Sequence, residues 1–153
     1  MGERRARPHR AVTAVTRTLQ IRAEWEGEHR FATGRPDGPV AMLDGSAVVG
    51  QSPMDAVLSA LAACSGVDVV DILGKRRTPP ERLTIEVVGT RREEMPRRYT
   101  AIELRFMIDG AGIDADQAQR AIALAFEKYC SVAATLAPDT AVRTVLVLNG
   151  EER

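Results

Sequence analysis

The chain has 153 residues, most simply one domain, and its 21 basic and 21 acidic residues leave no net charge. This balance argues against a general nucleic-acid binder, and an aromatic content of 4% leaves no evident platform for stacking bases. We expect no membrane span, because no apolar run reaches transmembrane length. Two cysteines without a secretion signal favour a cytoplasmic protein with functional thiols.

The N-terminal segment, residues 1–16, is basic but lacks the apolar core of a secretion signal. We therefore predict a flexible basic arm, followed by one domain over residues 17–153. The arginines of the arm are also compatible with a mitochondrial-type address, which is the less favoured alternative. The zero net charge is compatible with an oligomer but does not show one.

Short strands are predicted before residue 50. Alternating apolar residues over 17–25 predict a half-buried strand, and a turn at Gly27 would let the next segment pair with it. Asp44-Gly45 is a strong hairpin signal. Residues 29–33 could pair back with this strand. A short strand is predicted at 40–43, and another would return after the hairpin turn at 47–49.

A long buried helix is predicted over residues 52–77. Ser52 offers a capping hydroxyl, and Pro53 pre-sets the first helical φ angle. The segment is apolar nearly all round, which is typical of a helix in a core. Gly66 costs about 1 kcal/mol of helix stability relative to alanine, so we expect it to serve close packing.

The second half of the chain predicts two strands, a helix and a last strand. The strands, 82–92 and 99–109, have alternating apolar residues and should form an antiparallel hairpin. A helical stripe follows from Asp114 to about Leu136, and 142–148 is predicted as the final strand. This order of elements predicts an α+β fold, with helices packed on a largely antiparallel sheet.

The two cysteines, Cys64 and Cys130, lie in the two predicted helices. Two interpretations carry equal weight from the residues alone: a redox pair, or two buried side chains that act as small hydrophobes. No metal is expected, because the spacing of the cysteines does not match a metal motif. Only His9 and His29 could add imidazole ligands, and a structural zinc needs four.

The residues around the cysteines resemble those of the OsmC/Ohr family, most closely its YhfA-like branch. That branch carries a helix of the form PSPME…CxxIDVVSIL and a segment EKYCSV. This chain has SPMDAVLSALAACSGVDVVDIL, then RREEMPRRYT between the two predicted strands, and EKYCSV. The resemblance covers the chain from about Leu19 onward. The cysteine motifs are specific, whereas the N-terminal third matches loosely.

The resemblance implies an intertwined homodimer, with two long central helices per subunit, sheets wrapped around them and two active sites near the subunit interface. It also implies a thiol-dependent peroxidase that acts on small organic hydroperoxides. Cys64 would attack the peroxide and Cys130 would resolve the sulfenic acid as a disulfide, which an external dithiol reduces. No cofactor, nucleic acid or membrane is expected to take part.

Such chemistry needs a reactive thiolate and a nearby cation. The family places an arginine of an N-terminal loop there, held by a glutamate just before the first helix. Arg35 is the preferred candidate for the arginine and Arg30 the alternative, although a solvated loop charge is an equally good interpretation. Gly50 and Gln51 stand where the glutamate would be sought, so efficient peroxidase activity is in question.

Four more residues are candidates for binding or orienting roles. Asp68 lies one turn after Cys64, and Glu127 lies three residues before Cys130, each on the same helix face as its cysteine. Either could hold a cation or orient a thiol, or instead serve in a cap or a dimer contact. Met54 and Tyr129 are predicted as core or pocket lining.

Two functions compete at this point. The first is the two-cysteine peroxidase. The alternative is a non-catalytic dimeric protein on the same fold that binds a small molecule or senses redox state, which the absent glutamate favours. A purely structural role ranks last, because both cysteine motifs are present.

Overall fold

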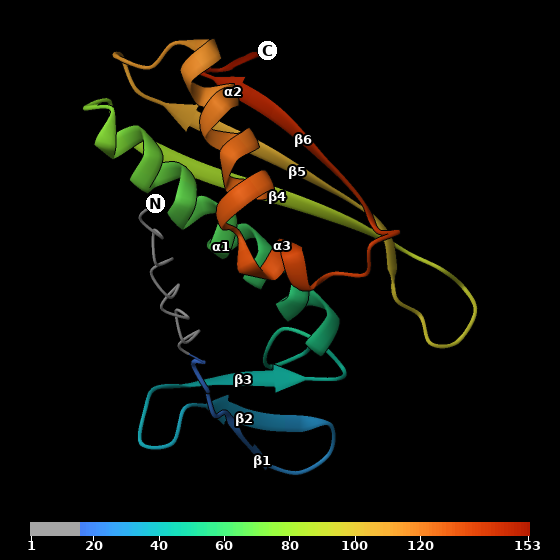
Figure 1. Cartoon of the computed structure of the whole chain (residues 1–153). Coiled ribbons are helices and arrows are strands. Elements are labelled where there is room, and N and C mark those ends of the chain that lie inside the picture. The colour runs from blue at the N-terminus through green and yellow to red at the C-terminus, as the bar shows by residue number, and fades with distance from the viewer. Residues whose placement is uncertain (1–15) are drawn as a thin grey trace, which may run out of the picture.

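The computed structural model describes residues 16–153, so the predicted arm lies outside the described residues except for Thr16. The described chain forms a three-stranded sheet, a four-stranded sheet and a set of helices between strands (Figure 1). In chain order the elements are β1 (Arg22–Trp25), β2 (Arg30–Gly34), β3 (Val40–Asp44), α1 (Pro53–Lys75), β4 (Arg82–Arg91), β5 (Tyr99–Asp109), α2 (Ala115–Leu124), the π-helix η1 (Ala125–Tyr129), α3 (Ser131–Thr135), β6 (Ala141–Leu148) and β7 (Glu151–Glu152).

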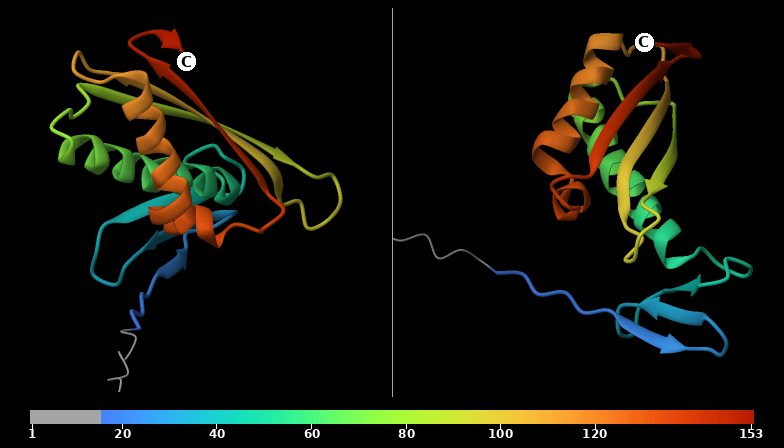
Figure 2. Two further views of the ribbon diagram at one scale, coloured as in Figure 1. Left: turned by 45° about the horizontal axis from the view of Figure 1, so that its top comes forward. Right: turned by 90° about the vertical axis from the view of Figure 1, so that its right-hand side faces the viewer.

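The four-stranded sheet has the order β4-β5-β6-β7, and α1 and α2 lie on one of its faces (Figures 1 and 2). Strands β4 and β5 form the predicted antiparallel hairpin, with Arg82 opposite Asp109. Strand β6 runs parallel to β5, because α2 and the helical turns after it carry the chain back across the sheet. The fold is α+β, as predicted.

The core lies between β5 and the two long helices. Strand β5 alternates as the sequence indicates, so that Ile102, Leu104, Phe106 and Ile108 are all buried. They meet the buried face of α1, which carries Leu61, Val69 and Leu73, and that of α2, which carries Ala118, Ala121 and Ile122. This helix-and-sheet unit, residues 53–148, is called the body below.

Helix α1 begins and packs as its sequence predicts. The Ser52 hydroxyl accepts the Asp55 amide at 3.1 Å, and the Asp55 carboxylate accepts the Ser52 amide at 3.0 Å, which forms a capping box. Gly66 lies against β4: a Cβ atom there would come within 3.0 Å of Ile85 Cδ1. Gly66 therefore lets helix and strand approach closely.

The expectation about apolar length is wrong for α1. With 23 residues and a mean hydropathy of 1.9 in its most apolar window, this helix meets the length and composition criteria for a membrane span. Its packing gives a different role, because Leu61, Val69 and Leu73 are fully buried against β-strands and α2. Helix α1 is therefore a core helix of this fold.

The second predicted helix is wrong in its continuity. The sequence predicts one helix from Asp114 to about Leu136, but α2 ends at Leu124 and passes into the π-helix η1. Cys130 then leaves helical geometry, with φ −68° and ψ 98°, before the short α3. Apolar periodicity does not reveal this break, because the residues on both sides remain compatible with a helix.

The N-terminal sheet, β1-β2-β3, is antiparallel and lies apart from the four-stranded sheet, close to the start of α1 (Figures 1 and 2). Its first strand begins at Arg22, not at residue 17. The predicted half-burial of this strand is also wrong: Leu19, Ile21 and Trp25 are all more than 60% exposed. Within residues 16–153, no apolar residue of its three strands is buried.

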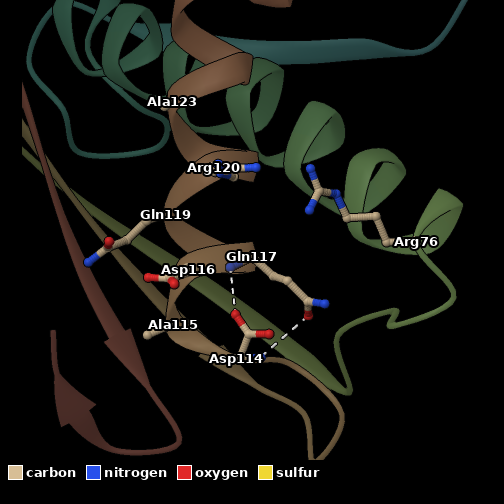
Figure 3. A pocket seen from close by; sticks show the side chains of 8 residues that line it. All are labelled: Arg76, Asp114, Ala115, Asp116, Gln117, Gln119, Arg120 and Ala123. Atoms are coloured by element: carbon tan, nitrogen blue, oxygen red, sulfur yellow. Dashed lines mark hydrogen bonds between the residues drawn. The ribbon is translucent and has the colours of Figure 1, made fainter.

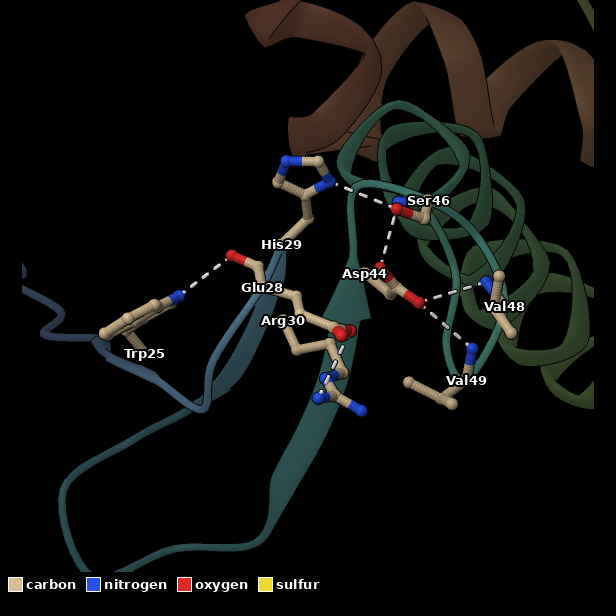
Figure 4. A network of polar contacts seen from close by, with 8 residues as sticks. All are labelled: Trp25, Glu28, His29, Arg30, Asp44, Ser46, Val48 and Val49. Atoms are coloured by element: carbon tan, nitrogen blue, oxygen red, sulfur yellow. Dashed lines mark hydrogen bonds and ion pairs between the residues drawn. The ribbon is translucent and has the colours of Figure 1, made fainter.

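The predicted return strand at 47–49 does not form. The buried Asp44 carboxylate instead accepts the amides of Ser46, Val48 and Val49 at 2.9–3.1 Å, which holds these residues in a turn (Figure 4). These bonds hold the pKa of Asp44 below its usual range. The side chain of Asp44 therefore satisfies the amides that a hairpin partner would have bonded.

Candidate active site

The structure brings the two thiols together. Sγ of Cys64, Sγ of Cys130 and a carboxylate oxygen of Asp68 all lie within 4.8 Å of one another. Both cysteines are free thiols. Cys64 is half-buried on α1, whereas Cys130 is only 3% exposed. Such a pair is close enough to form a disulfide after small side-chain movements.

The π-helix η1 positions Cys130. The Cys130 amide donates to the Ala125 carbonyl at 2.7 Å, which closes the wide turn. Cys130 then caps α3, and its Sγ accepts the Ala133 amide at 3.4 Å. Isolated π-turns are frequent at functional sites because they re-aim a side chain out of the regular helix. The apolar pattern of the sequence, which predicts one continuous helix here, does not reveal this turn.

Burial and the thiol pairing keep Cys130 protonated. The pKa of Cys130 is raised to about 11, mainly by burial and also by the neighbouring Cys64. The Ala133 amide acts in the opposite direction. Cys130 is therefore held in its neutral form.

Asp68 is the third member of the cluster. Its Oδ2 atom is buried and has no hydrogen-bond partner among the residues that the structure describes. Burial raises the pKa of this carboxyl, and the charge of Asp71 adds to the effect. The carboxyl thus lies beside both sulfurs without a cation or a hydrogen-bond donor to compensate it.

A hollow of about 300 Å³ opens beside Asp68. Its lining joins the ends of both long helices and combines apolar with charged side chains: Asp68, Asp71, Ile72, Lys75, Arg76, Leu124 and Tyr129. Asp68 and Tyr129, two candidates from the sequence, line this hollow, whereas neither cysteine does. Lys75 and Arg76 were not among the candidates; their place at the C-terminal end of α1, beyond Asp68, was the signal available.

The other predicted binding residues are less closely associated with the thiols. Tyr129 is 49% exposed, with the Lys128 ammonium 5.4 Å from its ring centre. Glu127 is exposed. Met54 packs against the core, and its carbonyl accepts the Tyr99 hydroxyl at 2.9 Å. These observations fit the structural alternatives for Met54 and leave the roles of Glu127 and Tyr129 as predictions.

Both candidate arginines belong to the N-terminal sheet. Arg35 is exposed in the loop after β2. Arg30 lies opposite Asp44 in the β2–β3 ladder and forms an ion pair with Glu28 at 3.3 Å (Figure 4). Neither arginine is among the groups that shift the pKa of Cys130 or Asp68. A cation from the same chain is therefore not seen at the thiols within residues 16–153.

The segment before α1 has no room or chemistry for the glutamate. A Cβ atom on Gly50 would fall 2.4 Å from the Met42 carbonyl oxygen, so this backbone excludes any side chain there. Gln51 donates its amide to the Ser59 hydroxyl at 2.6 Å. Neither residue can supply a carboxylate that holds an arginine.

A larger hollow, of about 820 Å³, lies at the start of α2 (Figure 3). Asp114 caps that helix through reciprocal bonds with Gln117, and Arg76 of α1 faces Arg120 across the opening (Figure 3). Neither cysteine lines it. The hollow is a polar recess between two helix ends and is separate from the thiol site.

Comparison with known proteins identifies the family. The family model described as "OsmC-like protein" matches residues 44–145. The chain is also 38% identical over 119 residues to "Protein YhfA" of Escherichia coli K12, which spans 77% of this chain and 89% of that protein. The chain belongs to the OsmC-like family.

Solved structures share the fold. A hypothetical protein from Aquifex aeolicus is 28% identical and superimposes with a TM-score of 0.79, covering 88% of this chain and 98% of that one. The organic hydroperoxide resistance protein OhrB of Bacillus subtilis is 17% identical, with a TM-score of 0.58 over 85% of this chain and 98% of its own. The family match begins at the end of β3, so it contains both cysteines but not the N-terminal sheet.

Proposed function

We propose that this protein is a cytoplasmic, thiol-dependent peroxidase that reduces organic hydroperoxides through a Cys64–Cys130 disulfide cycle. The observation that carries the proposal is the pairing of two free thiols within 4.8 Å, one accessible and one buried. The family membership supports it, as does the fold shared with a protein named for organic hydroperoxide resistance.

The reaction assigns a different role to each thiol. The Cys64 thiolate attacks one peroxide oxygen, the O–O bond breaks, and the other oxygen leaves with a proton as the alcohol. Cys64 is then a sulfenic acid. The Cys130 thiol attacks that sulfur, water leaves, and the disulfide forms, which prevents further oxidation. An external dithiol returns both cysteines to thiols.

A homodimer supplies what one chain lacks. Val67 and Val70 of α1 are exposed, and with Leu83 and Ile85 of β4 they line an open apolar hollow along the helix. The N-terminal sheet also exposes large apolar residues, including Trp25, which is 67% exposed. In the proposed dimer a second copy covers both surfaces, and the N-terminal sheet of one subunit brings Arg35 toward the thiols of the other.

The first test measures hydroperoxide consumption with a dithiol as reductant. Cys64→Ser should reduce the rate to that of the uncatalysed reaction, and Cys130→Ser should stop turnover while Cys64 still oxidises once. Ser131→Ala, next to Cys130 and exposed, should leave the rate unchanged. Full activity in Cys64→Ser would overturn the proposal.

The arginine is tested separately. Arg35→Ala should lower kcat/KM for the hydroperoxide, because the thiolate of Cys64 loses its compensating charge. Arg22→Ala is the matched control, because Arg22 and Arg35 line the same small recess in the N-terminal sheet. If Arg30→Ala lowers the rate and Arg35→Ala does not, the role belongs to Arg30.

A second candidate function rests on Gly50 and Gln51. Since neither supplies a carboxylate to pair with an arginine, a non-catalytic dimer that binds a small apolar molecule or senses redox state is the alternative. Under this alternative the protein would retain a ligand on purification and would not consume hydroperoxide. Mass spectrometry of the native protein, together with the turnover assay, separates the two functions.

A further inference from the structure

The thiol site also has the composition of a metal site. Its three donor atoms come from Cys64 and Asp68 on α1 and from Cys130 after η1. No metal was expected from the sequence, because that expectation rested on the spacing of the cysteines and on the few histidines. It did not consider Asp68 as a ligand. Two sulfurs and one carboxylate oxygen converge on one point only because the helices cross there.

The distances suit a small tetrahedral cation. With Zn–S bonds of about 2.3 Å and Zn–O bonds of about 2.0–2.2 Å, tetrahedral ligand atoms lie roughly 3.5–3.8 Å apart. The three donors here lie within 4.8 Å of one another, so they need to draw in by about 1 Å at most. Rotation of the cysteine and aspartate side chains supplies such a movement.

The unpartnered Asp68 oxygen is a second, independent observation. A buried carboxylate oxygen without a donor is costly, and native structures compensate such atoms with a hydrogen bond, an ion or a metal. A cation between the oxygen and the two sulfurs would compensate it directly.

We propose that reduced Cys64, Cys130 and Asp68 bind one thiophilic divalent cation, with Zn²⁺ as the best match, and leave a fourth position open. Thiolates select soft or borderline metals, and Zn²⁺ accepts sulfur and carboxylate ligands in one tetrahedral site. The hard cations Mg²⁺ and Ca²⁺ prefer oxygen ligands only, so they do not compete.

Metal binding and the disulfide exclude each other, because a cysteine binds the metal as a thiolate. When one hydroperoxide oxidises the metal-bound pair, the two thiolates supply two electrons, and two protons are taken up. The products are the disulfide, one alcohol and one water, and Zn²⁺ is released. Bound Zn²⁺ therefore slows the reactions of the reduced thiols, and oxidation of the thiols expels the metal.

The test uses the reduced full-length chain and Co²⁺, whose thiolate bonds give a charge-transfer absorption band. One Co²⁺ per chain should bind, and Zn²⁺ should displace it. Cys64→Ser and Cys130→Ser should lose the band. Asp68→Asn should weaken Zn²⁺ binding by on the order of 10- to 100-fold or more. Loss of a residue that only hydrogen-bonds a metal ligand already has an effect of this size.

Glu86→Gln is the control, because Glu86 is an exposed carboxylate on β4 and is not part of the thiol cluster. It should bind Zn²⁺ as the wild type does. Equal affinity in Asp68→Asn and the wild type, or an equal loss in both variants, would overturn the three-ligand site. Circular dichroism checks that each variant is folded.

A second measurement does not depend on the variants. Zn²⁺ should slow alkylation of both thiols in the wild-type protein, and a chelator should restore the rate; unprotected thiols would contradict the proposal. Because these measurements contain no peroxide, metal binding and peroxidase activity can fail independently.

Discussion

The two sheets of this chain are stabilised in different ways. The four-stranded sheet buries one face under α1 and α2, and its central strand β5 contributes Leu104, Phe106 and Ile108, all fully buried. The N-terminal sheet pairs its backbone fully, but its first strand is exposed throughout. Backbone pairing alone is thus compatible with a sheet whose strands bury no apolar side chain within residues 16–153, and in the dimer that we propose a second chain covers it.

Replacing Phe106 should have the largest effect on the body. Phe106→Ala removes a fully buried ring that packs edge-on against Phe126, with centroids 6.3 Å apart. We expect a loss of about 3–5 kcal/mol in the free energy of unfolding, measured by urea denaturation. Val88→Ala, on the exposed face of β4, should change it by less than about 0.5 kcal/mol; similar losses in both variants would contradict the body as the cooperative core.

A charge on the open face of α1 should act on assembly instead. Val67 is 61% exposed in one chain, so Val67→Glu should leave the fold of each chain intact. In the proposed dimer the new charge becomes buried without a partner, which costs roughly 3 kcal/mol and weakens the dimer about 100-fold. Sedimentation velocity measures this, with Val88→Glu as control. A Val67→Glu dimer as tight as the wild type would remove this face from the interface.

The smallest effect is expected at Asp44, within the N-terminal sheet. Because its pKa is lowered in the folded protein, the ionised carboxylate stabilises the turn above the unfolded pKa near 3.8, and this contribution is lost as pH falls through the lower folded value. Asp44→Asn should show the same loosening at neutral pH. Hydrogen exchange should then accelerate at Ser46, Val48 and Val49 and remain unchanged in β5. Faster exchange throughout the chain would show that the two regions unfold together.

The sequence predicted the body well because periodic burial dominates there. The alternation of Ile102, Leu104 and Phe106 and the Ser52 cap each have one physical cause that local sequence reveals. The N-terminal sheet was predicted less well, since Asp44 bonds its own loop and Trp25 finds no core within the chain. Local pattern does not reveal either effect.

For the candidate site, the sequence identified the two cysteines and Asp68 but not how they meet. The π-helix before Cys130 is closed by the backbone bond from the Cys130 amide to the Ala125 carbonyl, which no residue type encodes. The buried, unpartnered oxygen of Asp68 depends on how the helices cross. The family resemblance supplied the roles proposed for the cysteines, and the geometry places Asp68 beside both sulfurs.

The most direct test of the central claim is a single-turnover reaction. Fully reduced protein is mixed with one equivalent of an organic hydroperoxide per chain, in the absence of any reductant, and the thiols, the alcohol and the disulfide are then quantified. The account predicts the loss of two thiols per chain, one alcohol formed, and a Cys64–Cys130 disulfide found by peptide mapping. Folded protein that keeps both thiols free while the hydroperoxide remains would contradict it.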